Sequence, residues 1–476
     1  MRFFLSWFAT FGIDSPLIYT RTAELSSGVI PPFAIHVPIT HNAFIPGPGI
    51  AVLYYLMFSI TRNPIYVGMI TGVLQILGIF VLYRLFSQIY SKKTAGIVAF
   101  LMLLNPWLCY YSVGLWNPGL IFLFSSLAFY SLYKLKNDNK SVYWATLAFS
   151  ICMAAQVHMS AFLLIVVCAA YLLFYRIWPK IKDVFTCLCI FVFLFFPYIR
   201  YEIINNGKNT LALFSGATGT SFKLESLLRA LHFSVIFQSD EIAHFAGAGI
   251  YRAIFFYKYH PLLSVVLIPL SILTVYFSYV MFWTFLKNNF SMKKLKTLGK
   301  VETAGDSTVA FLFIVAFIIN PLIYYFTPRP FSPHNLIVIA PFLWIPIASF
   351  VDKPGKLFFP YLRLKQLGYI YVIASLIAVY MILVSHPYQV PVKDVIKIAG
   401  FIGQEQNTPV YLEGVEEITQ IDALETLHKN YFARTYKLIA DSEKDAKTKF
   451  ILMDKRRQPI TGNIVFETST AIVLQK

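Results

Sequence analysis

Long apolar runs separated by short polar connections form the dominant pattern of this chain. A helix that crosses a membrane needs roughly 20 mostly apolar residues. Runs near this length lie at about residues 65–88, 95–113, 118–135, 141–157, 159–176, 184–199, 260–286, 308–327, 333–351 and 367–386. An apolar segment at residues 1–13 is interpreted as the end of a further membrane helix, so about eleven transmembrane helices are predicted. The expected fold class is an all-α polytopic membrane protein.

Residues 47–61 are also apolar but are too short to span. About 15 residues supply only about 22 Å of helix, against a hydrocarbon core of about 30 Å. We therefore predict a helix that lies at the membrane interface. With this assignment all Lys and Arg clusters between spans fall on one side, which the positive-inside rule makes the cytoplasm. These clusters are Arg84/Lys92/Lys93, Lys134/Lys136/Lys140, Arg176/Lys180/Lys182, Lys287/Lys293/Lys294/Lys296/Lys300 and Lys353/Lys356/Arg363/Lys365.

The same topology assigns two long polar loops to the outer side, residues 14–63 and 200–258. It divides the chain into a membrane domain at residues 1–386 and an extracytoplasmic domain at residues 387–476. The second domain is expected to be a small α/β domain, because strand-like runs surround a helical pattern near residues 421–431. The strand-like runs are residues 410–412, 450–453, 464–466 and 471–474.

Composition agrees with a membrane protein and excludes several other classes. Hydrophobic residues make up 57% of the chain and charged residues 13%. The net charge of +17 does not indicate nucleic-acid binding, because Lys and Arg lie between apolar runs and not on one soluble face. The five cysteines lie in or beside apolar runs without zinc-site spacing. The chain has no phosphate-binding loop and no G-x-G-x-x-G motif, which disfavours an ATP-driven pump or a dinucleotide enzyme. No cofactor is predicted, and the use of a divalent cation is left open.

The polar stretch at residues 14–46 gathers most of the ionisable side chains near the start of the chain, including His36 and His41. Ser15 and Pro16 predict a helix start, with Ser15 as the cap. On that helix Asp14 and Arg21 are nearly eclipsed, while Glu24 lies about 80° round the axis. Asp14 either has a chemical role or only favours the positive end of the helix.

Three outer turns carry further candidates, each with a structural alternative. Pro46-Gly47-Pro48-Gly49 is a chain reversal or a place where the backbone approaches a ligand closely. Trp116-Asn117-Pro118 either binds a ligand or combines a membrane-edge aromatic anchor with a helix start. His158, in Gln156-Val157-His158, either donates to a phosphate or satisfies a neighbouring group.

Arg329, followed by His334, sits between two prolines at another outer turn. A guanidinium there suits a phosphate, because arginine makes forked hydrogen bonds to phosphate oxygens. The alternative is an anchor to ordinary phospholipid headgroups. Asp240 and Glu241 with His244 supply a base or a divalent-cation site, or are solvated loop residues.

The order of these parts resembles a known family. Asp14 in the first outer loop is followed by Arg21-Thr22-Ala23-Glu24-Leu25 with Gly28, by Gly47-Pro48 and by Tyr54-Tyr55-Leu56. Further along stand Asn105-Pro106-Trp107, Tyr110-Tyr111-Ser112, Trp116-Asn117-Pro118 and Gln156-Val157-His158. This order resembles the membrane glycosyltransferases of the protein O-mannosyltransferase and lipid A aminoarabinose-transferase type, which have the GT-C fold and are grouped with glycosyltransferase family 39.

The resemblance implies a hexosyl or pentosyl transferase in a bacterial inner membrane, with its active site on the extracytoplasmic face. The donor is then a sugar on a polyprenyl phosphate, the acceptor a lipid, glycan or protein, and the other partners are membrane lipids and not nucleic acid. Asp14 becomes the general base, and Arg329, or else His158 or Arg21, stabilises the departing phosphate. The implied substrate-binding residues are Arg21, Glu24, His41, Trp116, Asn117, His158, Arg329 and His334.

Two other functions fit many of these features. A flippase or transporter of lipid-linked glycans also needs many helices and outer cations, although transporters usually hold ionisable groups near the middle of the membrane. An O-antigen polymerase or ligase joins oligosaccharides en bloc. Transport without a new glycosidic bond, or a product larger by more than one sugar, distinguishes these alternatives.

Overall fold

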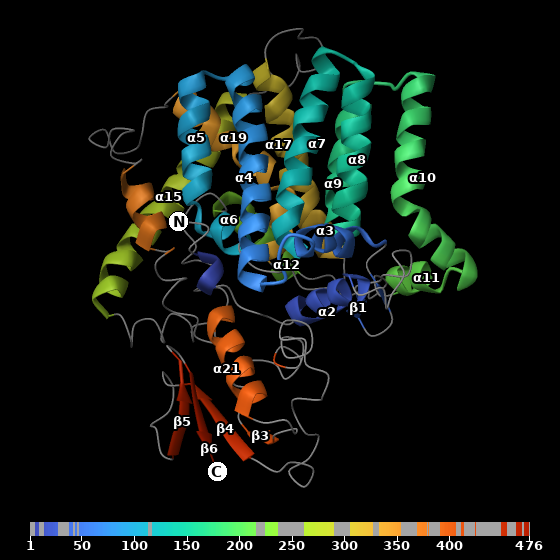
Figure 1. Cartoon of the computed structure of the whole chain (residues 1–476). Coiled ribbons are helices and arrows are strands. Elements are labelled where there is room, and N and C mark those ends of the chain that lie inside the picture. The colour runs from blue at the N-terminus through green and yellow to red at the C-terminus, as the bar shows by residue number, and fades with distance from the viewer. Residues whose placement is uncertain are drawn as a thin grey trace.

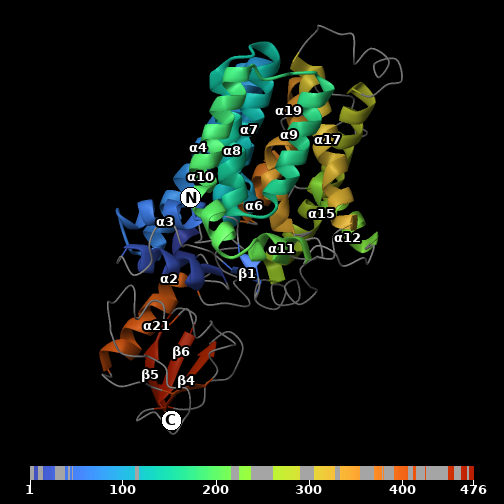
Figure 2. The same cartoon turned by 90° about the vertical axis from the view of Figure 1, so that its right-hand side faces the viewer.

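The chain folds into a helical bundle with a smaller sheet-containing unit beneath it (Figures 1 and 2). The computed structural model describes residues 5–8, 14–26, 38–40, 43–44, 47–112, 117–215, 224–236, 261–289, 305–326, 333–353, 369–377, 379, 391–405, 411–413, 424, 449–454, 463–468 and 471–475. The candidates His36, His41, Trp116, Asp240, Glu241, His244 and Arg329 lie outside these residues, as does most of the predicted helix at 421–431.

Helices are found within the ten predicted spans from residue 65 onward, whereas the predicted helix end at residues 1–13 is described only over residues 5–8, with a 3-10 helix, η1 (Ser6–Phe8). The helices in the ten spans are α4 (Pro64–Ile89), α5 (Lys92–Leu104), α6 (Pro106–Tyr111), α7 (Asn117–Asn137), α8 (Ser141–Val157), α9 (Ala161–Phe174), α10 (Ile181–Ile204), α15 (Pro261–Asn289), α17 (Gly305–Phe326), α18 (Ala340–Leu343), α19 (Ile345–Asp352) and a helical stretch over 369–377. Within the described residues, α4, α10 and α15 are long and apolar enough to cross a membrane, and α8 and α9 are shorter apolar helices. The count of about eleven spans therefore stays a prediction.

Two predicted spans are interrupted by proline. The run at 95–113 breaks at Asn105, because Pro106 lacks the backbone N–H that would continue α5. The run at 333–351 begins as a 3-10 helix, η2 (Pro333–Val338), and restarts twice, with prolines in the first turns of α18 and α19. Hydrophobic periodicity does not register such breaks, since the apolar pattern continues through them.

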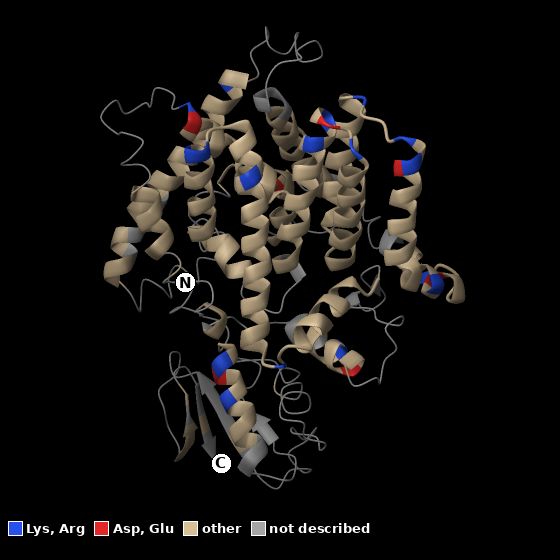
Figure 3. Ribbon diagram, turned by 45° about the horizontal axis from the view of Figure 1, so that its top comes forward, with Lys and Arg blue, Asp and Glu red and all other residues tan. Residues whose placement is uncertain are grey.

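One end of the bundle carries the basic clusters. Figure 3 shows Lys and Arg gathered where α4 meets α5, α7 meets α8 and α9 meets α10. Polar contacts tie these turns together: the Asp352 carboxylate accepts from Thr94 Oγ1 at 3.1 Å, and Asn139 Nδ2 donates to the Trp178 carbonyl at 3.2 Å. We call this the basic end. Its composition follows the charge pattern expected for the side that faces the cytoplasm.

The opposite end carries two short helices, α2 (Asp14–Ser26) and α3 (Gly49–Phe58), which we call the α2–α3 platform. Between them lies a two-stranded antiparallel ribbon, β1 (Pro38–Thr40) and β2 (Ala43–Phe44). Figure 1 shows α3 lying crosswise to α4, and its ten residues cover only about 15 Å. The expected short helix is found, and its location at the membrane interface stays a prediction. The predicted cap is wrong, because α2 begins at Asp14 and Ser15 is its second residue.

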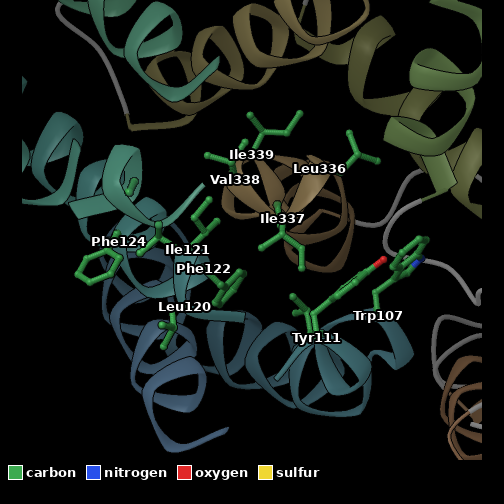
Figure 4. Close-up of a cluster of buried hydrophobic side chains, with 14 of the residues drawn as sticks. Trp107, Tyr111, Leu120, Ile121, Phe122, Phe124, Leu336, Ile337, Val338 and Ile339 are labelled. Carbon is green, nitrogen blue, oxygen red and sulfur yellow. The ribbon is translucent and has the colours of Figure 1, made fainter. Parts of the chain in front are cut away.

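The helices α11 (Lys208–Ser215) and α12 (Leu224–Ile236) also lie at the platform end (Figure 2). A buried cluster fills the bundle above them. Figure 4 shows Trp107 and Tyr111 of α6 and residues 120–122 of α7 facing the η2 segment that carries Ile337. Leu336, Ile337 and Val338 are fully buried there. The tight turns of η2 are therefore held by core packing.

The smaller unit consists of α21 (Val392–Glu405) and a four-stranded sheet in the order β3-β4-β6-β5. The strands are β3 (Tyr411–Glu413), β4 (Lys449–Asp454), β5 (Asn463–Glu467) and β6 (Ala471–Gln475), so the four predicted strands are found. The pair β3–β4 is parallel and the others are antiparallel. Phe401 of α21 stacks on Phe466 with ring centroids 4.5 Å apart. The helix α21, which also contacts α4, was missing from the sequence prediction.

Candidate functional site

The two helices of the platform run antiparallel. Near one end, Tyr19 donates to the Arg62 carbonyl at 2.5 Å, and its ring meets that of Phe58 at 4.7 Å. Near the other end, Leu25 packs against Ala51. Asp14 therefore begins α2 on the side where α3 leads into α4. The carboxyl-terminal half of α2 lies beside the start of α3.

Arg21 and Glu24 form an ion pair on α2. Arg21 Nη1 lies 3.0 Å from Glu24 Oε2, and the two side chains are 37% and 22% exposed. A partly exposed pair of this kind contributes little to stability. It does keep the guanidinium beside a carboxylate, which reduces the positive charge that Arg21 offers to a phosphate.

A buried joint connects the platform to the bundle at the start of α3. The amide of Gln156, near the end of α8, accepts a hydrogen bond from the Gly49 N–H at 3.0 Å. The same amide donates from Nε2 to the Leu194 carbonyl of α10 at 3.2 Å. Gly47 has a φ of +109°, a conformation that suits glycine. The glycine-rich turn is thus both a chain reversal and a close backbone approach, with a glutamine as the group approached.

His158 occupies the turn between α8 and α9, as predicted. It caps the carboxyl end of α8, and its Nδ1 accepts the Ser160 N–H at 3.1 Å. The Ser160 hydroxyl lies 2.9 Å from the same nitrogen. Because Nδ1 is an acceptor, the neutral ring carries its proton on Nε2, the nitrogen suited to donate to an anionic oxygen.

His334 meets His158 across the platform end. The two rings lie edge to face with centroids 5.5 Å apart. His334 is in the first turn of η2, whose following residues are locked into the core (Figure 4). Two of the predicted substrate-binding residues, His158 and His334, are therefore neighbours in space although they are far apart in sequence.

For the other predicted residues, the structure gives either the position in a helix or no description. Asp14 begins α2 and Asn117 begins α7, so Trp116-Asn117-Pro118 does contain the helix start that was considered. His41, Trp116 and Arg329 lie outside the described residues, so their predicted roles stay predictions. In the part of the chain that the structure describes, no group of three His, Cys, Asp or Glu side chains is arranged to hold a metal ion.

A second histidine contact joins α12 to α15 at the platform end. His232 Nδ1 lies 2.7 Å from the Tyr279 hydroxyl. Burial lowers the pKa of His232 below its ordinary value of 6.5, because the charged ring loses solvation there. The neutral ring is thus the form favoured in the folded protein.

Gln156 is the residue whose role sequence reasoning missed, although it stands in a motif that was singled out. Its partners are Gly49, which is 107 residues away, and Leu194, which lies in another helix. No local pattern reports a contact over that distance. The only sign of this role in the sequence is a polar amide side chain near the end of an apolar run, where the neighbouring residues are of the kind that is buried.

The whole fold is similar to that of solved membrane proteins. The crystal structure of ArnT from Cupriavidus metallidurans bound to undecaprenyl phosphate superposes with a TM-score of 0.56 at 10% identity, over 100% of this chain and 96% of that one. The apo structure of the same protein gives a TM-score of 0.54 at 12% identity, over 100% and 95% of the two chains. The chain is thus a multi-pass membrane protein with the GT-C fold, and the resemblance inferred from the sequence is confirmed.

Residues 46–201 match the family model described as dolichyl-phosphate-mannose-protein mannosyltransferase. The matched region runs from the glycine-rich turn through the joint at Gln156 and His158 into α10. No curated protein matches the chain by overall sequence. The likeness is therefore one of fold along the whole chain and of sequence along this segment.

Proposed function

We propose that this protein transfers one sugar from a polyprenyl-phosphate donor to a lipid, glycan or protein acceptor. The observation that carries the proposal is the full-length GT-C fold shared with a protein crystallised with undecaprenyl phosphate. The match of residues 46–201 to a mannosyltransferase family model supports the same reaction class. The reaction forms a glycosidic bond to the acceptor, breaks the bond between sugar and phosphate, and inverts the anomeric carbon.

The platform end supplies groups of the required kinds. Asp14 takes the proton from the acceptor group as that group attacks the anomeric carbon of the sugar. General-base catalysis of this kind typically contributes about 10²–10⁴-fold in rate. His158 and His334 lie together where an Nε2–H can donate to the departing phosphate. Arg329 remains the first candidate for a fixed cation, with Glu24, Arg21, His41, Trp116 and Asn117 as surrounding substrate contacts.

The charge distribution supports an orientation with the platform outside. The basic end carries the Lys and Arg clusters that favour the cytoplasm (Figure 3), and the platform lies at the opposite end (Figure 1). We therefore propose a bacterial inner membrane protein with an extracytoplasmic site, in which the 387–476 domain is also outside. A lipid-borne donor reaches such a site from within the bilayer.

The test is transfer by the purified full-length protein in lipid nanodiscs. Synthetic polyprenyl-phosphate-linked hexoses and pentoses are offered as donors, and membranes from cells lacking the gene supply the acceptors. Asp14→Asn is expected to abolish transfer while leaving insertion intact. Asp138→Asn, in an exposed loop at the basic end, is the matched control and should transfer normally. Full activity of Asp14→Asn would refute its assignment as base, and repeating the assay with EDTA decides whether a divalent cation takes part.

A further inference from the structure

The side chain of Gln156 is buried, and its amide is hydrogen-bonded at both ends. The side chain is 1% exposed, and both ends of the amide are hydrogen-bonded to backbone groups of other elements. The acceptor end holds the first residue of α3, and the donor end holds α10. One amide thus connects three elements at the platform end.

The neighbouring glycines show how closely the platform fits around this amide. A Cβ added at Gly47 would stand 2.5 Å from Gln156 Oε1, and one added at Gly49 would stand 2.7 Å from Gln156 Cβ. At Gly49 the atom approached is the Gln156 Cβ, which cannot turn away, so a side chain would force the two elements apart. At Gly47 the side-chain amide could turn aside, but the φ of +109° already disfavours any residue other than glycine. The backbone of the turn therefore lies in close contact with the Gln156 side chain.

The contact of Gln156 with α10 lies in the turn that precedes a proline. Pro197 lies inside α10, three residues after Leu194. A proline removes one helical hydrogen bond and opens the turn before it, which exposes carbonyls to other donors. The Leu194 carbonyl in that turn accepts from Gln156.

We propose that Gln156 is a positioning residue for the transfer reaction, which holds the α2–α3 platform against the bundle and so sets where Asp14 stands. This inference rests on the proposed function. The connection runs from Gln156 to Gly49, along α3, and through the packing of Tyr19 on Phe58 to the start of α2. His158 stays in place by its own bonds to Ser160.

The first test separates kcat from KM. Gln156→Ala frees the platform but leaves His158 and His334 in place, so we expect kcat to fall about 10–100-fold with KM for the donor changed less than about twofold. Ser150→Ala is the matched control, because Ser150 is buried in the same helix and bonds only to the Thr146 carbonyl of that helix. A kcat within about twofold of wild type, or a rise in KM alone, would overturn the proposal.

The second test uses a variant of nearly the same shape. A neutral carboxyl introduced by Gln156→Glu accepts from Gly49 and donates to the Leu194 carbonyl, whereas the ionised form has no proton to donate and repels that carbonyl. We expect Gln156→Glu to retain most of the wild-type kcat at acidic pH and to lose it progressively as pH rises. A pH profile parallel to that of the wild type would contradict the proposed contact.

A third measurement does not depend on transfer. Hydrogen exchange of the full-length protein should show faster exchange over residues 47–58 in Gln156→Ala than in wild type or Ser150→Ala. If exchange rises but wild type transfers no sugar from any polyprenyl-phosphate donor, the proposed function fails while the joint stands. If wild type transfers sugar and Gln156→Ala matches it in kcat and in exchange, the inference about Gln156 fails alone.

Discussion

His158 and His334 come from distant parts of the chain and lie edge to face at the platform end. If they donate to the phosphate of the donor lipid, each hydrogen bond to that anion is worth about 1.5–3 kcal/mol. His158→Ala and His334→Ala should then each raise KM for the donor by about 10-fold or more, measured from initial rates. His232→Ala is the control, because this histidine contacts Tyr279 of α15 and is not among the predicted substrate-binding residues. Unchanged donor KM in both variants would remove these residues from the site.

Gly119, next to the Trp116-Asn117-Pro118 motif, predicts a second single-residue effect. A Cβ there would lie 2.3 Å from the Tyr111 carbonyl oxygen, which is backbone and has no freedom to turn away. Gly119→Ala should therefore destabilise the protein by about 1–3 kcal/mol, measured by unfolding in detergent. Gly96→Ala is the matched control, because nothing lies within 4 Å of that position and alanine favours a helix by about 0.5–1 kcal/mol.

The positions of single residues could be predicted from the sequence, whereas contacts between distant residues could not. The sequence predicts a turn between two helices at His158 because it interrupts an apolar run, and the structure places His158 at the end of α8. Its proximity to His334 and the bonds of Gln156 depend on how helices pack. Ser15 was misplaced because helix ends shift by a residue or two without any change in the local pattern.

At the scale of elements, the break between α5 and α6 depends on Asn105. Its side chain caps α6 by accepting from the Leu108 N–H at 3.0 Å and donates to the Tyr371 hydroxyl at 3.2 Å. Asn105→Ala should cost about 1–3 kcal/mol, because a helix cap and a buried hydrogen bond are both lost. Tyr371→Phe should cost less, since the cap remains. Equal losses for the two variants, in the same unfolding assay, would contradict a capping role.

The contact between α12 and α15 should weaken in acid. Since the pKa of His232 is lower in the folded protein than its ordinary value of 6.5, the unfolded chain binds more protons as pH falls. The contribution of this contact is complete above that ordinary value and is lost as pH falls through the folded value. Melting temperatures across this range should fall more steeply for wild type than for His232→Phe. Identical slopes would show that the histidine does not titrate on unfolding.

The elements with strong hydrophobic periodicity were predicted well. The other elements were missed, each for a physical reason. Apolar runs located α4, α7 and α10, and alternating residues located the four strands of the smaller unit. The helix α21 was not predicted although Val395, Ile398 and Ile402 recur on one face, because this pattern covers only a few turns. The breaks at Asn105 and in the 333–351 run come from proline, which ends hydrogen bonding without lowering hydrophobicity.

For the whole molecule, the orientation in the membrane is the main prediction. In a cysteine-free background, Thr20→Cys on α2 and Arg62→Cys should react with a membrane-impermeant maleimide added outside intact cells. Lys93→Cys at the basic end should react only after permeabilisation. If α3 spanned the membrane, Thr20→Cys and Lys93→Cys would label from the same side, which would overturn the assignment of the platform.

The contacts of Gln156 also determine when the platform can dock during synthesis of the chain. The platform residues leave the ribosome early, yet their anchoring amide follows Gly49 by 107 residues and the Leu194 carbonyl comes later still. At about 5–20 residues per second, the chain between Gly49 and Leu194 takes roughly 7–30 s to make. In the proposed topology, the first outer segment is translocated during that interval without its docking partner. We therefore expect the final docking of the platform to be a late event of biogenesis, which awaits insertion of the helices that follow it.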